Sequence, residues 1–160
     1  MNGYVRDAFT YLLNPPSVRA TETAGTSAAN NANVVVPWGG ESWDTTGDMH
    51  NTSSQTSRIV APDPGIYVVT VFVRWVTNAT GIRTINLRMN AGGNPAGGTT
   101  LLSANAGALS GVQTPHIVSR QIVMDPGDYV ETFISQSSGG TLALDAGASF
   151  CEMYWMRNKP

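Results

Sequence analysis

Residues that commonly perform acid–base or nucleophilic chemistry are few in this chain. It has two histidines and one cysteine among 160 residues. His50 lies in a Gly-Asp-Met-His-Asn-Thr segment and His116 opens a strand-like segment, and no Gly-x-Ser-x-Gly motif presents a serine nucleophile. Cys151 stands in the middle of an apolar, strand-like segment, which is typical of a small buried residue rather than a thiolate nucleophile. We therefore expect no enzymatic activity.

Carboxylates could provide metal-ion or glycosidase chemistry. Asp44 and Asp48 stand close to His50 in a segment where oxygen ligands would suit a calcium ion. Their spacing differs from that of an EF-hand loop, and an Asp in such a segment usually caps a turn through the backbone. Glu131 and Glu152 lie on expected strands, but nothing in the sequence places them opposite each other as glycosidase chemistry requires. We expect no metal ion and no cofactor.

The four tryptophans divide into two groups. Trp75 and Trp155 lie in strongly apolar segments and are expected in the core. Trp38 and Trp43 flank a Gly-Gly pair, and we expect them to form an exposed contact loop together with His50. Two exposed indole rings can stack on sugar rings, so this loop is a candidate contact surface.

The composition excludes several classes of function. Only 12% of the residues are charged, against a usual share of about 25%, and the formal net charge is −2. No stripe of basic residues is present to bind phosphates, so we expect no nucleic-acid partner. The apolar runs are too short for a membrane-spanning helix, so we expect no membrane insertion.

The first 16 residues have a different pattern from the rest of the chain. Apolar side chains recur at the spacing of one helix face, and Pro15 and Pro16 end this pattern. The predicted anchoring residues are Val5, Phe9, Leu12 and Leu13. Such a short helix is marginal alone in water, so its apolar face must pack on its own domain or dock on a neighbouring subunit or a larger assembly. We divide the chain into an anchoring helix, residues 1–16, and one domain, residues 17–160.

After Pro16 the pattern changes to short strands separated by Gly- and Pro-containing turns. Alternation of apolar and polar residues, as in Arg83–Ala91, predicts antiparallel strands with one buried face. The expected strands are Ser17–Glu22, Val34–Trp38, Ser57–Ala61, Ile66–Val76, Ile82–Ala91, Thr99–Ala104, Pro115–Met124, Asp128–Gln136, Thr141–Asp145 and Ala148–Met156. This series predicts a β-sandwich.

Two of these strands are apolar on both faces. Ile66, Val68 and Phe72 oppose the main apolar face of their strand, and the last strand repeats the pattern. The residues concerned there are Phe150, Tyr154 and Met156. A sandwich covers only one face of each sheet, so the second face needs cover from another subunit or from the loops and the N-terminal helix. We expect an oligomer.

Three segments resemble C1q/TNF-like jelly rolls. An Ala-Pro-x-x-Gly-x-Tyr turn, Ala61–Tyr67, leads into the longest strand, and Asp125–Val130 has the Gly-Asp-x-Val entry to a later strand. Ala-Ser-Phe150 and the alternating residues after it resemble the closing strand of that family. The resemblance covers Ser17–Met156 and implies an all-β, antiparallel jelly roll that assembles as a homotrimer. Its interface would contain Phe150, Tyr154 and Met156, close to the threefold axis.

Shorter segments resemble small virion proteins of tailed phages, especially phages of actinobacteria. They are Tyr4–Asp7, the Leu-Leu-Asn-Pro-Pro stop, Trp43-Asp44 with Met49-His50, Arg74-Trp75, Asn78–Arg83 and Ser138–Leu142. Such proteins are minor tail or fibre-like proteins, and related jelly rolls decorate capsids. Fibre-like members carry longer N-terminal segments than the 16 residues here, so capsid decoration stays open.

The expected function is therefore structural. We expect a non-enzymatic, trimeric protein on the virion surface that is associated with the tail and contributes to host contact. Its partners would be copies of itself, other tail or capsid proteins, and a glycan of the host cell surface. The loops Trp38–Asn51, Asn78–Gly81 and Gly92–Gly98 would form its exposed end. The alternatives are a capsid decoration protein that stabilises the head shell and, from another class, a carbohydrate-binding module.

Overall fold

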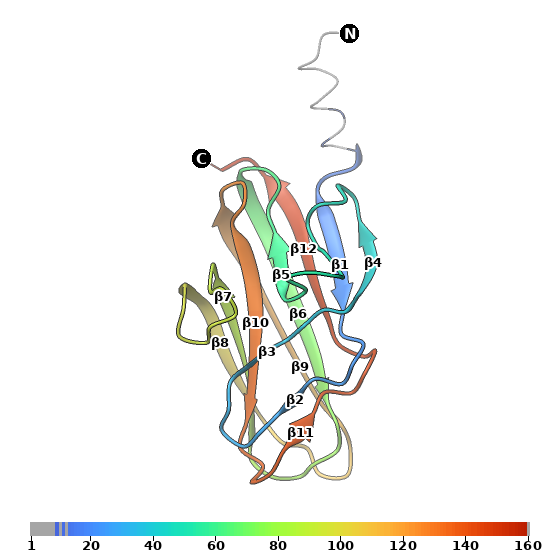
Figure 1. Ribbon diagram of the computed structural model, residues 1–160, viewed down its shortest axis with the longest axis vertical. Helices are drawn as coiled ribbons and strands as arrows, with labels where there is room; N and C mark the ends of the chain where they lie inside the picture. The colour runs from blue at the N-terminus through green and yellow to red at the C-terminus, as the bar shows by residue number, and fades with distance from the viewer. Residues whose placement is uncertain (1–8, 10, 12, 160) are drawn as a thin grey trace.

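The computed structural model describes residues 9, 11 and 13–159 (Figure 1). Two of the predicted anchoring residues, Val5 and Leu12, lie outside the described residues. In the described part of the chain, Phe9, Tyr11 and Leu13 have a helical backbone. None of the helical segments among the described residues is long and apolar enough to cross a membrane.

Strands make up nearly all of the regular structure in residues 13–159. They are β1 (Ser17–Thr21), β2 (Ser27–Ala28), β3 (Val34–Val35), β4 (Gly40–Asp44), β5 (Arg58–Val60), β6 (Gly65–Trp75), β7 (Ile82–Met89), β8 (Thr99–Gly107), β9 (Thr114–Met124), β10 (Tyr129–Gln136), β11 (Leu142–Ala143) and β12 (Phe150–Arg157). The predicted all-β class is confirmed, and each predicted strand overlaps an observed one.

The strands form two antiparallel sheets that pack face to face (Figure 1). The first sheet has the order β4-β1-β12-β6-β9. The second sheet has the order β3-β10-β7-β8, and β5 also pairs with β10. A small pair, β2 with β11, lies at the end of the sandwich opposite the C-terminal end of β12. Most consecutive strands therefore lie in different sheets, as in a jelly roll, whereas β7 and β8 are paired neighbours within the second sheet.

The core lies between the two sheets because alternate residues of each strand point to it. In β6, five residues of one parity are fully buried: Tyr67, Val69, Val71, Val73 and Trp75. Ile85 and Leu87 of β7 and Ile134 of β10 bury the facing surface of the second sheet. The prediction that Trp75 belongs to the core is confirmed, whereas Trp155 is half-buried at its margin.

The predicted contact loop Trp38–Asn51 is partly a strand. β4 occupies Gly40–Asp44 and pairs with β1 at the edge of the first sheet, with a register irregularity between Arg19 and Ala20. None of the five residues of β4 is buried, so the alternation that marks a strand in sequence is absent. Pairing with β1, which no local pattern indicates, determines its conformation.

The three predicted loops do not form one exposed end. Gly92–Gly98 joins β7 to β8, and Asn78–Gly81 joins β6 to β7. These two connections flank opposite ends of β7 and lie toward opposite ends of the sandwich (Figure 1). Six of the seven residues of Gly92–Gly98 are exposed, as expected, but only two of the four residues of Asn78–Gly81 are, and the two loops cannot contact the same small target together.

Candidate functional site

Trp38 does not belong to a contact surface. Its side chain is fully buried, and its backbone N–H donates to the Thr56 carbonyl at 3.0 Å. Val34, Val36 and Trp38 share one parity, so the alternation of β3 continues past Pro37 and directs the indole into the core. The prediction of an exposed Trp38 was wrong for this reason, whereas Trp43, on β4, is exposed as predicted.

The predicted exposure of His50 was also wrong. Its imidazole ring is enclosed, with Nδ1 at 3.3 Å from Glu41 Oε2 and Nε2 at 3.2 Å from the Thr56 carbonyl. The Asp44 carboxylate accepts hydrogen bonds from four backbone N–H groups, including those of Met49 and His50. Asp44 is thus the turn cap expected from the sequence, and its oxygens are occupied by these donors.

Cys151 and His116, the other candidates for chemistry, are also buried in the sandwich. Cys151 is buried, and desolvation raises the pKa of its thiol to about 12, so it stays protonated at neutral pH. The His116 ring is buried on β9, and the loss of solvent lowers its pKa. The predicted burial of Cys151 is confirmed.

The two glutamates that a glycosidase would need lie on different sheets. Glu131 of β10 is buried and accepts hydrogen bonds from the Ser57 hydroxyl at 2.8 Å and the Gly93 N–H at 2.9 Å. Glu152 of β12 is bound to Arg19 on the outer face of the first sheet. They do not face each other across one cleft, so the arrangement described for glycosidases is not formed.

The outer face of the first sheet is the most distinctive surface among the described residues. We use this name for the side of β1, β12, β6 and β9 that points away from the core. Its apolar residues are Ile66, Val68, Phe72, Ile117, Val123, Phe150, Tyr154 and Met156. Ile117 is 62% exposed and Val123 is 54% exposed. The structure thus brings all three predicted interface residues of β12 onto one face with the apolar residues predicted on β6.

An aromatic cluster occupies one end of this face. Phe72 and Phe150, on paired strands, stack with their ring centroids 5.5 Å apart and an interplanar angle of 24°. The Arg19 guanidinium carbon lies 3.9 Å from the centroid of the Phe150 ring and 5.7 Å from that of Trp43. Ile117 pairs with Phe72 on the next strand and extends the cluster. Cation–π contacts of this kind hold the arginine flat on the apolar surface.

A polar row separates this cluster from the rest of the face. Arg19 Nη1 donates to Glu152 Oε1 at 2.7 Å, and the two residues pair across β1 and β12. On β6 and β9, the Thr70 and Ser119 hydroxyl groups hydrogen-bond to each other at 2.9 Å. The polar groups of this row satisfy one another, so covering it would not leave an isolated charge.

A second apolar cluster lies beyond the polar row. Tyr154 pairs with Val68, and Ile66 pairs with Val123. Desolvation, with a smaller contribution from the nearby Glu152 carboxylate, raises the pKa of Tyr154 above its usual value. Tyr154 and Met156 remain partly exposed. This partial burial leaves apolar surface that another molecule could still remove from water.

The segment before β1 contacts the C-terminal part of β12, the central strand of the same sheet. The Tyr11 ring meets Trp155 edge to face, with centroids 4.9 Å apart. Pro16 is buried, and its carbonyl accepts a hydrogen bond from the Trp155 N–H at 2.8 Å, so Pro16 belongs structurally to the sandwich. Among the predicted anchoring residues that the structure describes, Phe9 is exposed and Leu13 is 82% exposed. Neither of these two side chains is buried against the described part of the domain.

Sequence reasoning missed the role of Arg19. The local signal was present, because Ser17, Arg19 and Thr21 alternate with the buried Val18 and Ala20. This alternation places Arg19 on the outer face of its strand. Its stacking on Phe150 depends on the pairing of β1 with β12, two segments more than 100 residues apart in the chain, and could not be predicted.

Comparisons with known proteins identify the fold. No protein-family model matches the sequence, and a search of curated proteins finds no match either. Among solved structures, the chain is similar to the Eiger TNF from S. frugiperda, with a TM-score of 0.62 and 14% identity over 92% of this chain and 96% of that one. It is similar to the globular domain of the zebrafish complement 1qA protein, with a TM-score of 0.59 and 12% identity over 90% of this chain and 99% of that one.

Murine APRIL at pH 5.0 gives a TM-score of 0.65 and 14% identity over 89% of this chain and 99% of that one. At such low identity these similarities concern the fold alone. The chain has the C1q/TNF-like jelly-roll fold, and the resemblance seen in its turns and closing strand is confirmed at that level.

Proposed function

We propose that this protein is a non-enzymatic structural protein that assembles as a homotrimer through the outer face of the first sheet, which we call the assembly face. The main observation in support is that exposed apolar side chains lie together on that one face. Ile117 and Val123 are the most exposed of them. Large apolar patches rimmed by polar residues are typical of protein–protein contact sites. Three copies, rather than another number, follow from the likeness to C1q/TNF-like jelly rolls.

The pattern of this face suits association between identical subunits. Removing apolar surface from water is favourable by about 25 cal/mol per Å², which offsets the entropy that the subunits lose when they associate. The Arg19–Glu152 pair and the Thr70–Ser119 pair are already satisfied within one subunit, so the polar row can enter an interface without an unpaired charge. Aromatic residues and arginine, both present here, are enriched at the energetic centres of interfaces.

A non-enzymatic role agrees with the positions of the reactive residue types. The thiol of Cys151 and the rings of His50 and His116 are buried, and Glu131 and Glu152 lie on separate sheets. The Glu131 carboxylate and the His50 ring are each held by hydrogen bonds to neighbouring groups.

The proposal includes a location. We place the trimer on the surface of a phage particle, associated with the tail, where it contributes to host contact. The support is the sequence likeness to small virion proteins, together with the low content of charged residues and the many small polar ones. A decoration protein of the capsid remains the second location that the same likeness supports.

A matched pair of variants tests the assembly face. Val123 and Val112 are both 54% exposed, but Val112 lies in the β8–β9 connection and not on the assembly face. Because both side chains are at the surface of one subunit, Val123→Glu and Val112→Glu should leave its stability within about 0.5 kcal/mol. Sedimentation should show that Val123→Glu is monomeric and that Val112→Glu keeps the mass of the unmodified protein. A trimer of Val123→Glu would place the interface elsewhere.

The proposed location has its own test. Immunogold labelling of intact particles with an antibody against residues 17–160 should place gold on the tail, and gold spread over the head would instead support decoration.

A truncated protein tests the anchoring role of the N-terminal segment. Removal of residues 1–13 keeps Pro16 and should leave a folded trimer that no longer joins the particle. Normal incorporation of this shortened protein would contradict the anchoring role of the N-terminal segment.

A further inference from the structure

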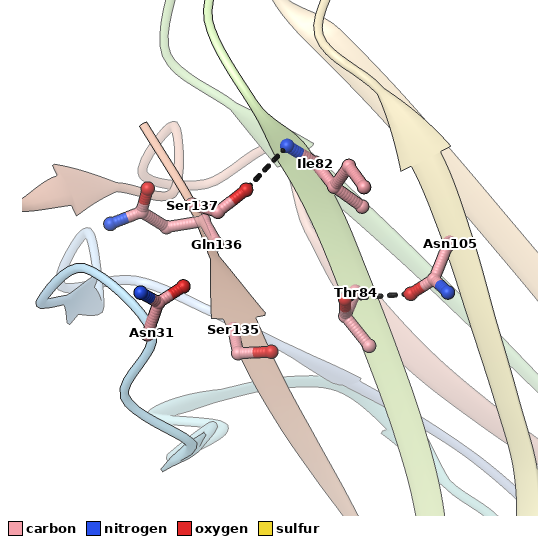
Figure 2. Close-up of a pocket in the computed structure, with 7 residues that line it drawn as sticks. All are labelled: Asn31, Ile82, Thr84, Asn105, Ser135, Gln136 and Ser137. Carbon is pink, nitrogen blue, oxygen red and sulfur yellow. Dashed lines mark hydrogen bonds between the residues drawn. The ribbon is translucent and has the colours of Figure 1, made fainter. Parts of the chain in front are cut away.

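A hollow of about 320 Å³ lies on the outer face of the second sheet, the side of β10, β7 and β8 that points away from the core (Figure 2). It is bounded by the end of β10, the start of β7, the end of β8 and the β2–β3 connection. Its lining residues are Asn31, Ile82, Thr84, Asn105, Ser135, Gln136 and Ser137. Pockets that hold small ligands begin at about this volume.

The register of the sheet aligns three of the polar side chains. Ser135 pairs with Thr84, and Thr84 pairs with Asn105, so hydroxyl, hydroxyl and amide follow one another across three strands (Figure 2). Asn31 approaches from the neighbouring connection, where its N–H donates to the Gln136 carbonyl at 2.7 Å. Side chains from four segments thus converge on one hollow.

Several of the polar groups that line the hollow already make hydrogen bonds within the protein. Thr84 Oγ1 donates to Asn105 Oδ1 at 2.7 Å, which fixes the amide so that its Nδ2 hydrogens stay available. Ser137 Oγ accepts from the Ile82 N–H at 2.9 Å, and the Gln136 side chain bonds to the Ala28 and Gly140 carbonyls. None of the side-chain hydrogen bonds found between described residues uses the Asn31 amide or the Ser135 hydroxyl. The hollow therefore offers both donors and acceptors.

The hollow is lined by uncharged residues only. Arg83, next to Ile82, is fully buried on the other side of β7, and its guanidinium donates to the Asn78 and Thr80 carbonyls. Ile82 is 50% exposed and supplies an apolar wall beside the amides and hydroxyls. A site of this kind can recognise hydroxyl groups and a C–H surface together, whereas it has no charge with which to bind a phosphate or a carboxylate.

The backbone around the hollow is held in place before any ligand arrives. Gly81 has φ +83, and a Cβ at that position would overlap the Ser137 carbonyl, so the two segments touch at the rim. Asn31 has φ +60, a conformation that asparagine tolerates better than most residues. A preformed site loses less conformational entropy on binding than a mobile one.

We propose that this hollow binds a neutral sugar residue of a glycan. Hydroxyl groups of the sugar would bond to the Asn31 amide, the Ser135 hydroxyl and Asn105 Nδ2, while its C–H face packs on Ile82. The site goes beyond the proposed assembly function and lies on the opposite sheet from the assembly face. It also replaces the earlier candidate platform of Trp38 and Trp43, because the Trp38 indole is buried.

The test is saturation-transfer difference NMR on the full chain with a panel of free sugars. The panel contains glucose, galactose, mannose, rhamnose and N-acetylglucosamine, with glucuronic acid and sialic acid as charged members. At least one neutral sugar should give a saturable signal. Since Ser135→Ala with Asn105→Leu removes two of the proposed hydrogen bonds to the sugar, the double variant should weaken binding by about tenfold or more.

Two control variants make the result specific. Ser53→Ala changes an exposed serine in the β4–β5 connection and should bind as the unmodified protein does. Val123→Glu should also keep sugar binding, so a failure of the assembly proposal would not be mistaken for a failure of this one. The proposal is overturned if no neutral sugar binds, if only the charged sugars bind, or if the double variant binds as tightly as the unmodified protein.

Discussion

The outer faces of the two sheets are built on the same pleated backbone and carry opposite chemistry. On the first sheet, three of the outward residues along one register row are apolar: Phe150, Phe72 and Ile117. On the second sheet, one outward row carries Ser135, Thr84 and Asn105. Covering the apolar surface of the first sheet lowers the free energy because apolar groups leave water. The polar surface of the second sheet can replace bound water by the hydroxyl groups of a ligand at little cost in free energy.

This difference explains why the two faces suggest different partners. An apolar face with aromatic residues and a stacked arginine is suited to a protein surface. A concave polar surface without charge is suited to a small neutral ligand with several hydroxyl groups. In one subunit the two faces lie on opposite sides of the core, so assembly through the first sheet would leave the second accessible.

The largest expected effect concerns the rim of the polar hollow. In Gly81→Ala, the new methyl group would meet the Ser137 carbonyl at a positive φ, which should lower the free energy of unfolding by about 3 kcal/mol. Denaturant titration monitored by tryptophan fluorescence measures this change. Gly47→Ala is the control, because it also has a positive φ but nothing within 4 Å of the added Cβ. Equal losses in both variants would show that the contact with Ser137 contributes nothing.

A smaller effect is expected from the polar row of the assembly face. Arg19→Ala removes the contact with Phe150 and leaves Glu152 without its partner, so trimer dissociation should become about tenfold easier, or more. Arg19→Lys keeps the charge but loses the planar group that stacks on Phe150. Its dissociation constant should therefore lie between those of the unmodified protein and Arg19→Ala. Sedimentation equilibrium gives the dissociation constants. If Arg19→Ala associates as tightly as the unmodified protein, the polar row is outside the interface.

The smallest expected effect is a dependence of assembly on alkaline pH. Burial raises the pKa of Tyr154 above the ordinary value of 10.0, so the protonated phenol is favoured where it is desolvated. Covering this residue in a trimer would raise that pKa further. The contribution to assembly is then fully present below pH 10 and is lost as the pH rises through the raised pKa. Sedimentation equilibrium gives the dissociation constant of the trimer at pH 8 and at pH 11, and the two values should differ less for Tyr154→Phe than for the unmodified protein. An undiminished difference would exclude Tyr154 as the cause.

The strands that alternate strongly were predictable from sequence. β6, β7 and β12 each bury one parity of residues, and the second apolar face of β6 and β12 was also visible in the pattern. β4 was missed because none of its residues is buried and only the pairing with β1 makes it a strand. The alternation of apolar and polar residues reflects alternating burial, and an exposed edge strand has no buried residues to produce it.

The site residues were harder to predict because they depend on contacts between distant segments. His50 is enclosed by Glu41 and the Thr56 carbonyl, and no spacing rule links these three residues. In the polar hollow, Ser135 and Thr84 are brought together by strand register, over a separation of about 50 residues. By contrast, the outward position of Phe150, Tyr154 and Met156 on β12 could be predicted because their parity alone places them on the outer face.

The oligomeric mass of the unmodified protein tests the central claim most directly. Sedimentation equilibrium on the full chain at neutral pH, over a wide range of concentrations, measures it without any substitution. The proposed homotrimer predicts a species of three times the 16.9 kDa chain. A single species of 16.9 kDa at every concentration would contradict the proposed assembly and leave this apolar face without its partner.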